Sequence, residues 1–264
     1  MIHAEGDCPS ARCRRYISMD KTVKALVLRE VKYKEADRIL TVLTEDGKLT
    51  MKAPGALRKN SKCGAATQQL TFSELTLYTR VGHWQVREGI VLEPFDGLRK
   101  DLEKLSLAVY LAQVLEAVSD EDAASPELLQ LGLNSLFALS SGLAEDWLIK
   151  AVFELRLACL TGYTPEVMGC LHCGETEGEL YFDGENGGIV CGRHRGYGVR
   201  KISPACLAAV RHVVTAPAKK IFSFRLTGDA CREFADLCEK YLLSRLERSF
   251  STLDYYKSIR IETL

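Results

Sequence analysis

The sequence predicts an α+β fold, in which a small five-stranded β-barrel precedes a larger α-helical domain that contains a metal-binding insert. Apolar side chains alternate with a period of two between Val23 and Pro94, and from Phe95 they recur with a helical period of about 3.6. Residues 169–196 then gather three of the ten cysteines and two of the five histidines. We therefore expect a disordered tail over 1–18, a barrel over 19–95 and a helical domain over 96–264.

Five segments of the N-terminal part have the pattern of short strands. VKALVLREV alternates, RILTVLT and KLTMKAP flank the hairpin signal Asp46-Gly47, and FSELTLYTR and HWQVREGIVLEP form a second pair. So many short strands in succession favour a closed barrel, because closure removes exposed sheet edges. An OB-fold usually has a helix between its third and fourth strands. Here GALRKNSKCGAATQQ shows no clear periodicity, and we predict a loop.

Helices are expected over the rest of the chain. The first starts at Leu98, the second follows Pro126, and the third runs from about Glu145 to Gly162. Ser203 is the expected N-cap of a later helix, with Pro204 in its first turn. The last long helix should place on one side Ala230, Phe234, Leu237, Cys238, Tyr241 and Arg245. Four cysteines are expected at helical core positions, namely Cys159, Cys206, Cys231 and Cys238.

The cysteine-rich stretch, GCLHCGETEGELYFDGENGGIVCGRHRG, has the spacing of a zinc site at 170–194. Cys170 and Cys173 form one pair, and Cys191 and His194 form a second after seventeen intervening residues. Zinc prefers four tetrahedral ligands from thiolate and imidazole groups, and two such pairs match a zinc ribbon. His172, inside the first pair, is a weaker candidate for the place of His194. Four protein ligands leave no position for a reacting water, so the predicted zinc is structural.

Other chemistry for these cysteines is less favoured. A redox dithiol lacks the strand-then-helix context of thioredoxin-like motifs. The first residues carry no apolar secretory signal, so we expect a cytoplasmic protein with reduced thiols, which disfavours a disulfide. No apolar run is long enough to span a membrane. No phosphate loop, nucleophile elbow or pair of acid–base carboxylates is recognisable, so an enzyme is not predicted.

Charge is balanced overall but unevenly distributed. The chain has 35 Lys and Arg against 35 Asp and Glu. Residues 20–100 carry 15 basic and 10 acidic side chains, residues 101–169 carry 3 and 11, and residues 201–264 carry 11 and 7. This partition suggests separate roles, with one region attracted to a polyanion.

Cations of the predicted barrel are candidates for binding nucleic acid, because clustered Lys and Arg neutralise phosphates. Three aromatic side chains nearby, Tyr33, Tyr78 and Trp84, would either stack on bases or belong to the barrel core. The candidate DNA-binding residues are Arg29, Lys32, Lys34, Arg38, Lys52, Arg58, Lys59, Lys62, Arg80 and Arg87.

Three segments in this order resemble the RecO family of DNA repair and recombination mediators. They are ADRILTVLTEDGKLTMKAPGALRKNSK in the barrel, GYTPEVMGCLHCG at the first cysteine pair and GGIVCGRHRG at the second. The resemblance extends from about Met19 to the C-terminus and excludes the preceding tail. The fourth metal ligand, often Cys in the family, is His194 here, and some members lack the cysteines.

The resemblance implies an N-terminal OB-fold and a helical C-terminal domain with an embedded zinc site. It also implies binding of single- and double-stranded DNA, annealing of complementary strands and association with the bacterial nucleoid. RecR and single-strand-binding protein are the implied partners, with which the family helps to load recombinase. A transcription-factor-like zinc-ribbon interaction module without annealing activity is the alternative, and a metal-dependent nuclease is a third hypothesis.

Overall fold

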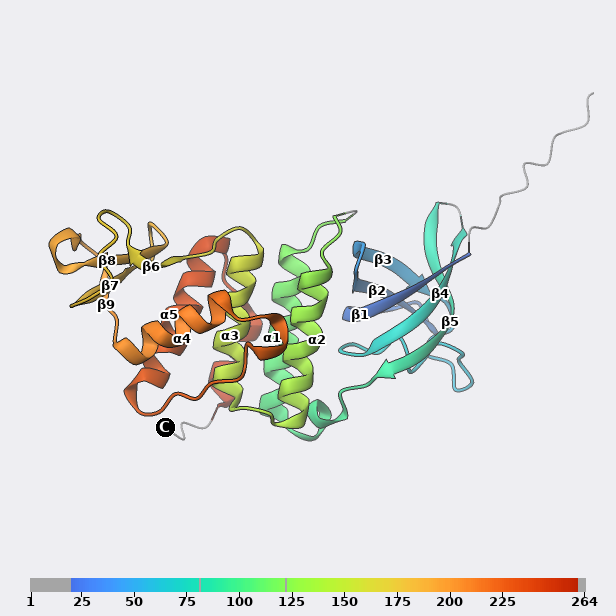
Figure 1. Cartoon of the computed structure of the whole chain (residues 1–264). Coiled ribbons are helices and arrows are strands. Elements are labelled where there is room, and N and C mark those ends of the chain that lie inside the picture. The colour runs from blue at the N-terminus through green and yellow to red at the C-terminus, as the bar shows by residue number, and fades with distance from the viewer. Residues whose placement is uncertain (1–19, 81, 122, 261–264) are drawn as a thin grey trace, which may run out of the picture.

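The computed structural model describes residues 20–80, 82–121 and 123–260. A β-barrel lies at one end, helices form the middle and a small second sheet lies at the other end (Figure 1). This arrangement confirms the predicted α+β fold. The tail expected over residues 1–18 lies outside the described residues.

Five strands form the closed barrel, in the order β1-β2-β3-β5-β4. All neighbours are antiparallel except β3 and β5, which pair in parallel at Lys52 and Gln85. The period-two pattern predicted a closed barrel of five strands, which the structure confirms, but it did not predict the strand order or the parallel pair. The strands are β1 (Asp20–Tyr33), β2 (Asp37–Thr44), β3 (Gly47–Ala53), β4 (Phe72–Arg80) and β5 (His83–Glu93).

The segment between β3 and β4 contains turns and no helix, as predicted, but much of it is packed against the barrel. Ala56, Cys63 and Ala66 are buried members of the barrel core. At Gly89 on β5, a Cβ atom would lie 2.7 Å from the Cβ of Ala66, so only glycine admits the segment this closely. The predicted loop is therefore largely packed against the barrel, whereas residues 57–60 are exposed.

Six α-helices follow the barrel in the part of the chain that the structure describes. They are α1 (Leu102–Val118), α2 (Pro126–Ser141), α3 (Asp146–Leu160), α4 (Pro204–Thr215), α5 (Asp229–Leu246) and α6 (Ser251–Ile259). Short 3₁₀ turns are η1 (Asp96–Lys100), η2 (Gly192–His194) and η3 (Ala218–Lys220). No described helix is both long and apolar enough to cross a membrane.

The helix boundaries confirm some sequence predictions and correct others. Ser203 caps α4, because its hydroxyl accepts the Cys206 amide. The first helix starts later than predicted, since the Asp101 side chain accepts the amides of Glu103 and Lys104 and caps a new helix after η1. Two side chains expected in the core, Cys159 and Cys231, are only half-buried, while Cys206 and Cys238 are buried as predicted. On α5, Phe234 and Tyr241 are buried, but Ala230, Leu237 and Arg245 lie at the margin of the core.

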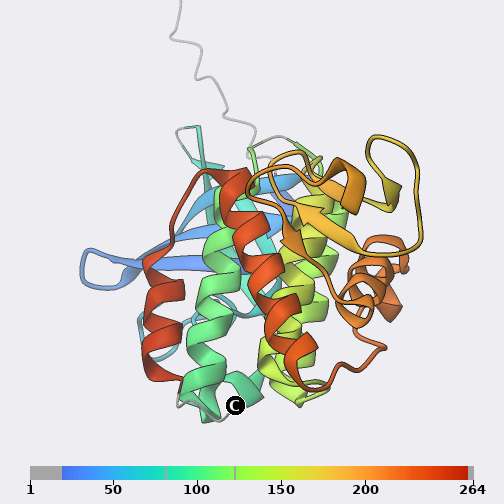
Figure 2. The same cartoon turned by 90° about the vertical axis from the view of Figure 1, so that its left-hand side faces the viewer.

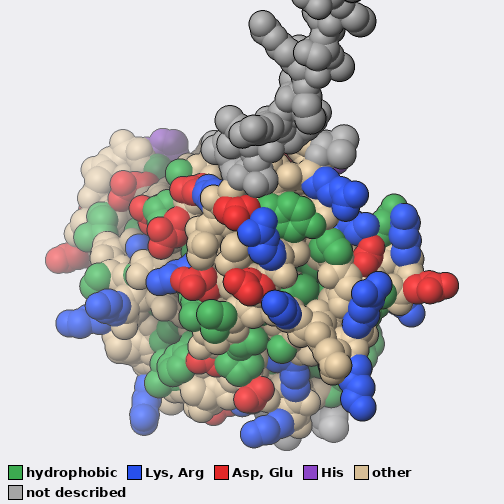
Figure 3. All heavy atoms as spheres, turned by 90° about the vertical axis from the view of Figure 1, so that its right-hand side faces the viewer, with side chains coloured by type: hydrophobic (Ala, Val, Ile, Leu, Met, Phe, Trp, Pro, Cys, Tyr) green, Lys and Arg blue, Asp and Glu red, His purple; other side chains and the backbone are tan. Residues whose placement is uncertain are grey.

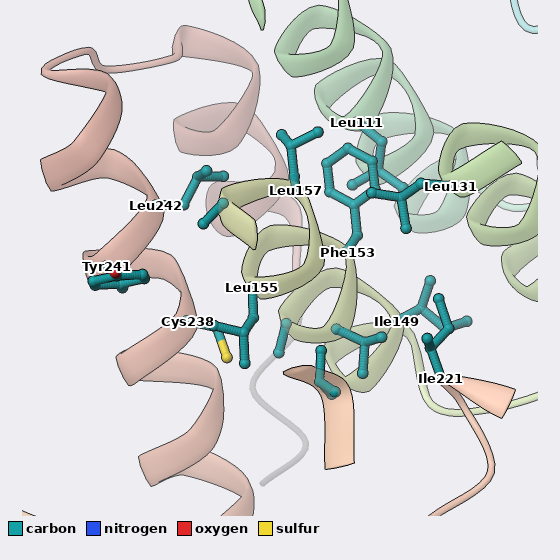
Figure 4. Packing of buried hydrophobic residues seen from close by; sticks show 14 of the residues in the cluster. Leu111, Leu131, Ile149, Phe153, Leu155, Leu157, Ile221, Cys238, Tyr241 and Leu242 are labelled. Carbon is teal, nitrogen blue, oxygen red and sulfur yellow. The ribbon is translucent and has the colours of Figure 1, made fainter. Parts of the chain in front are cut away.

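One hydrophobic core runs from the barrel through the helices. Figure 4 shows part of it, where Phe153 of α3 lies among Leu111 of α1 and Leu131 of α2. Leu26 on the barrel belongs to the same cluster. At Gly132 on α2, a Cβ atom would lie 3.3 Å from Leu26, so a small residue allows the barrel to approach this helix. The barrel and the helices are thus held together by continuous packing.

Backbone hydrogen bonds reinforce this junction at the β2–β3 hairpin. The Lys48 amide donates to the Asp120 carbonyl at 3.0 Å, and the Ser125 amide donates to the Glu45 carbonyl at 3.0 Å. Asp120 and Ser125 lie in the connection between α1 and α2, and Lys48 and Glu45 lie in the hairpin. The hairpin is thereby fixed against the helices, which sets the orientation of the whole barrel.

The second sheet has four short strands in the order β6-β8-β7-β9. Its strands are β6 (Glu166–Cys170), β7 (Leu180–Asp183), β8 (Gly188–Cys191) and β9 (Arg200–Lys201). Figure 2 looks onto the end of the molecule that carries this sheet, beside α4 and α5. The cysteine pairs lie at the ends of β6 and β8, so we refer to residues 166–201 as the metal hairpin.

Candidate metal centre and nucleic-acid interface

Two strand ends of the metal hairpin bring the predicted ligands together. Cys170 ends β6 and Cys191 ends β8, and the two strands are adjacent and parallel. After Cys170 the chain turns back, with the Gly174 amide donating to the Cys170 carbonyl at 2.8 Å. Gly174 has a φ of 72°, a conformation that favours glycine and completes the turn that carries Cys173. His194 follows in η2, immediately after β8.

The four side chains have the spacing of a tetrahedral metal site. The ligand atoms of Cys170, Cys173, Cys191 and His194 all lie within 4.8 Å of one another. Sγ of Cys173 is 3.8 Å from Sγ of Cys191, and Nδ1 of His194 is 3.4 Å from Sγ of Cys191 and 3.6 Å from Sγ of Cys170. A tetrahedron with zinc's usual bond lengths has edges of about 3.8 Å between sulfurs and about 3.6 Å between sulfur and nitrogen. The group can therefore hold a metal ion.

Electrostatics favours the anionic, metal-binding form for two of the three thiols, Cys170 and Cys191. Burial opposes ionisation of Cys170, but backbone amides of Cys191, His172 and Cys173 lower the pKa of its thiol to about 5. Burial likewise opposes ionisation of Cys191, yet the His194 side chain and neighbouring amides lower its pKa. A backbone hydrogen bond at Glu175 lowers the pKa of Cys173, but desolvation and hydrogen bonds with Cys170 and Cys191 raise that pKa overall. The pKa of His194 is raised by its hydrogen bonds to Cys191 and Cys170. In this arrangement His194 stabilises the thiolates, and a bound metal cation would take over that role.

His172 lies beside the group but not in it. Its ring centroid is 5.2 Å from that of His194, and the side chain is exposed. The structure therefore assembles the four predicted residues and leaves the weaker candidate outside. Whether they bind zinc stays a prediction.

The predicted DNA-binding residues separate into two groups in the structure. Four of them form ion pairs: Arg29 with Glu116, Arg38 with Glu30, Lys52 with Asp37, and Arg87 with Asp20. Among the described residues, the other six are exposed and have no carboxylate within salt-bridge distance, namely Lys32, Lys34, Arg58, Lys59, Lys62 and Arg80.

Two of the paired cations contribute visibly to the fold. Arg38 is largely buried and donates to the Gly64 carbonyl at 2.8 Å and to Thr67 at 3.0 Å, which anchors the β3–β4 segment. Arg29 reaches from β1 to Glu116 on α1 at 2.9 Å and braces the barrel against the helices. The six other cations have no such role in the described chain, so they are the stronger candidates for phosphate contacts.

The three aromatic candidates are placed differently. Tyr33 is 42% exposed, with the ammonium groups of Lys34 and Lys52 at 5.5 and 5.3 Å from its ring centroid. Trp84 is half-buried against the barrel core. Tyr78 is half-buried too, and its hydroxyl donates to Gln85 at 2.9 Å. Tyr33 is thus the one of the three that is open enough for stacking.

A hollow of about 390 Å³ lies on the barrel beside these residues. It is lined by Lys52, Pro54, Tyr78, Arg80, His83 and Gln85. His83 was not predicted to be a binding residue, because an isolated histidine in a hairpin forms no recognisable motif. Figure 3 shows cations interspersed with carboxylates over the face at this end of the molecule. The barrel surface therefore carries charges of both signs, and the six unpaired cations differ from the others in having no carboxylate within salt-bridge distance among the described residues.

Comparisons with known proteins agree with the arrangement of barrel and helices. The family described as "Recombination protein O N terminal" matches residues 19–95, and "Recombination protein O C terminal" matches residues 99–254. DNA repair protein RecO of Acetivibrio thermocellus is 34% identical over 238 residues, which cover 89% of this chain and 95% of that relative. DNA repair protein RecO of Heliobacterium modesticaldum is 34% identical over 244 residues, 88% of each chain. The chain therefore belongs to the RecO family.

Proposed function

We propose that this protein is a DNA repair and recombination mediator that binds single- and double-stranded DNA and anneals complementary strands. With RecR, it helps to load recombinase onto DNA coated with single-strand-binding protein, in the cytoplasm at the bacterial nucleoid. Membership of the RecO family supports this proposal most strongly. Its activity is binding and positioning of strands, without catalysis of a covalent step.

The barrel, residues 19–95, is the proposed nucleic-acid-binding domain. Support comes from the unpaired cations around Tyr33 and along the exposed part of the β3–β4 segment. Cations of this kind neutralise phosphates without reading sequence, and an exposed aromatic ring can stack on any base. A mediator that acts on arbitrary sequences needs this type of contact.

The helical domain, residues 96–264, is proposed to hold a structural zinc ion at 170–194. Cys170, Cys173, Cys191 and His194 would bind it, and the spacing of their ligand atoms supports this assignment. Bound zinc would tie the turns of the metal hairpin to its strands. Because all four positions are filled by protein, the ion would have no direct part in DNA chemistry.

Strand annealing tests the function. Complementary oligonucleotides coated with the cognate single-strand-binding protein are mixed with and without this protein, and duplex formation is followed by fluorescence. We expect accelerated annealing, which should fall in step with DNA affinity when Arg58, Lys59 and Lys62 are replaced by Ala. Replacement of Lys219 and Lys220 on η3, exposed cations outside the barrel, serves as the matched control.

Two results would contradict the proposal. Binding of DNA without any acceleration of annealing would favour a zinc-ribbon interaction module. Shortening of the oligonucleotides on addition of a divalent metal would indicate a nuclease instead.

A further inference from the structure

A cleft of about 1100 Å³ lies between the metal hairpin and α5. Both of these elements lie at the end of the molecule opposite the barrel (Figures 1 and 2). Phe182 from β7, Ile202 after β9 and Tyr241 from α5 are buried side chains that contribute apolar surface to it. It is larger than the hollow of about 390 Å³ on the barrel. Neither the proposed metal centre nor the barrel interface uses it.

Positive charge predominates in this cleft. Three carboxylates line it, and two already have partners: Glu233 accepts the Ser203 amide at 2.8 Å, and Asp236 pairs with Lys240 at 2.9 Å. Six cations also line the cleft, namely Arg200, Lys201, Arg232, Lys240, Arg245 and Arg260. Five of them have partners: Arg200 and Lys240 pair with Asp236, Lys201 pairs with Glu179, Arg260 pairs with Glu103, and Arg245 donates to backbone carbonyls. Among the described residues, Arg232 is the cation of this lining that has no such partner. A concave surface with this excess attracts an anionic ligand, because the low-dielectric walls concentrate the field.

Tyr197 stands next to the cleft in the loop between η2 and β9. Its side chain is fully exposed, and its neighbour Gly198 lines the cleft. Gly198 has a φ of 81°, which favours glycine and turns the chain back towards β9. An aromatic ring open on both faces beside a cationic cleft matches the requirements of base stacking with simultaneous phosphate contact.

We propose that this cleft binds a single strand of nucleic acid separate from the strand on the barrel, with Tyr197 stacking on a base and Arg232 contacting phosphate. Phe182 and Ile202 would offer apolar surface to an unstacked base. This inference rests on the proposed function and deepens it, because it gives the annealing of two strands a structural basis.

Charge in the middle of the molecule explains why the two sites would hold different strands. Helices α1, α2 and α3 lie between the barrel and the metal hairpin (Figure 1), and residues 101–165, which include them, carry 3 basic against 10 acidic side chains. A phosphate backbone crossing this region would be repelled. Each end of the molecule would therefore engage its own strand, which brings two mutually repelling strands onto one protein.

The test is the binding stoichiometry of the full-length protein with a fluorescent oligothymidine of about ten nucleotides, a length within the range that small sites cover. We expect two oligonucleotides per chain for the wild type. The double variant Tyr197→Ala, Arg232→Ala should bind one. Combined with replacement of Arg58, Lys59 and Lys62, it should also weaken the remaining binding on the barrel by at least roughly tenfold, because up to about three phosphate contacts are lost there.

The matched control is Tyr255→Ala combined with Arg225→Ala. Both side chains are exposed, lie in the same domain and do not line the cleft. Arg245 is left intact because it donates to the Gly184 and Glu185 carbonyls and holds the β7–β8 turn to α5. The control should keep the wild-type stoichiometry.

Several outcomes would overturn the inference. Two oligonucleotides bound by the Tyr197 and Arg232 variant would do so, as would an equal loss in the control. A Glu-rich peptide containing aromatic residues that binds the cleft without competition from oligothymidine would make it a peptide site. If only the barrel variant loses DNA binding, the proposed function stands and this inference falls; a wild type that binds no DNA contradicts both.

Discussion

The barrel and the metal hairpin are both small sheets, but different interactions stabilise them. Barrel strands run for 7 to 14 residues and close on an interior that includes Leu75 and Leu77, both fully buried. The strands of the metal hairpin have 2 to 5 residues, and every residue from Gly192 to Gly198 is exposed. The strands themselves pack on the helical core through side chains such as Phe182, Ile189 and Val190. The exposed turns have no such core, and the four candidate metal ligands lie in these turns or at the strand ends beside them.

This difference shows what each region demands of its sequence. The barrel needs many apolar residues in alternation, and each contributes a small part of its stability. The turns of the metal hairpin need four residues at fixed positions. A single substitution should therefore weaken the barrel but should abolish the local structure of the hairpin.

Replacement of a metal ligand should have the largest effect. Cys173→Ser should release the ion and destabilise the helical domain by at least about 4 kcal/mol, because metal binding free energy is folding free energy here. Elemental analysis and thermal unfolding measure the two effects. Cys231→Ser, a half-buried thiol outside the group, is the control and should keep one zinc per chain. Absence of stoichiometric zinc from the wild type would refute the metal site itself.

A cavity in the barrel should have a smaller effect and leave the metal in place. Leu77 is fully buried in the barrel core. Leu77→Ala should lower the free energy of unfolding by about 2–5 kcal/mol, the usual cost of a large-to-small change in a core. Urea unfolding gives the stability, and zinc content should stay at the wild-type value. Loss of zinc in this variant would show that the metal site depends on the stability of the barrel, against the account given above.

A titrating carboxyl at the start of α3, in the helical layer, should give a still smaller effect. Burial raises the pKa of Asp146 to about 6 from 3.8, with Lys104 opposing the rise. The folded state thus binds this proton more tightly than the unfolded state, and the associated stability is present below pH 3.8 and lost as pH rises through 6.

Asparagine cannot ionise, so Asp146→Asn should gain stability relative to the wild type between pH 4 and pH 7. We expect a change of about 1 kcal/mol, since the group is partly exposed and solvent weakens the effect. Thermal unfolding at the two pH values measures it. Asp254→Asn, on an exposed side chain in the first turn of α6, is the control. A difference between Asp146→Asn and wild type that does not vary with pH would contradict the assigned burial effect.

Much of this contrast could be predicted from local sequence. Period-two alternation and Asp46-Gly47 identified the strands, and Gly47 indeed has a φ of 115° in the hairpin. Ligand spacing identified the four residues of the candidate metal centre, because a knuckle is a local structure. Asp101 was missed as a cap, although an Asp before a helical run is a known start signal.

Long-range contacts could not be predicted in this way. Arg29 and Glu116 are 87 residues apart in sequence, and Arg87 and Asp20 are 67 apart, so nothing local shows that these cations are paired. Packing of Ala66 against Gly89 is likewise a product of barrel closure. The cleft beside Tyr197 exists only because α5 lies against the metal hairpin.

Salt dependence of single-strand binding tests the central claim, that unpaired barrel cations hold the phosphate backbone. Affinity for oligothymidine is measured over a series of salt concentrations for the wild type and for the variant with Arg58, Lys59 and Lys62 replaced by Ala. Stability and zinc content should not change, since these three side chains are exposed. We predict that the slope of log K against log salt flattens by about two, because up to about three phosphate contacts are lost. A variant with the wild-type affinity and slope would contradict the account and place the DNA path away from this part of the barrel.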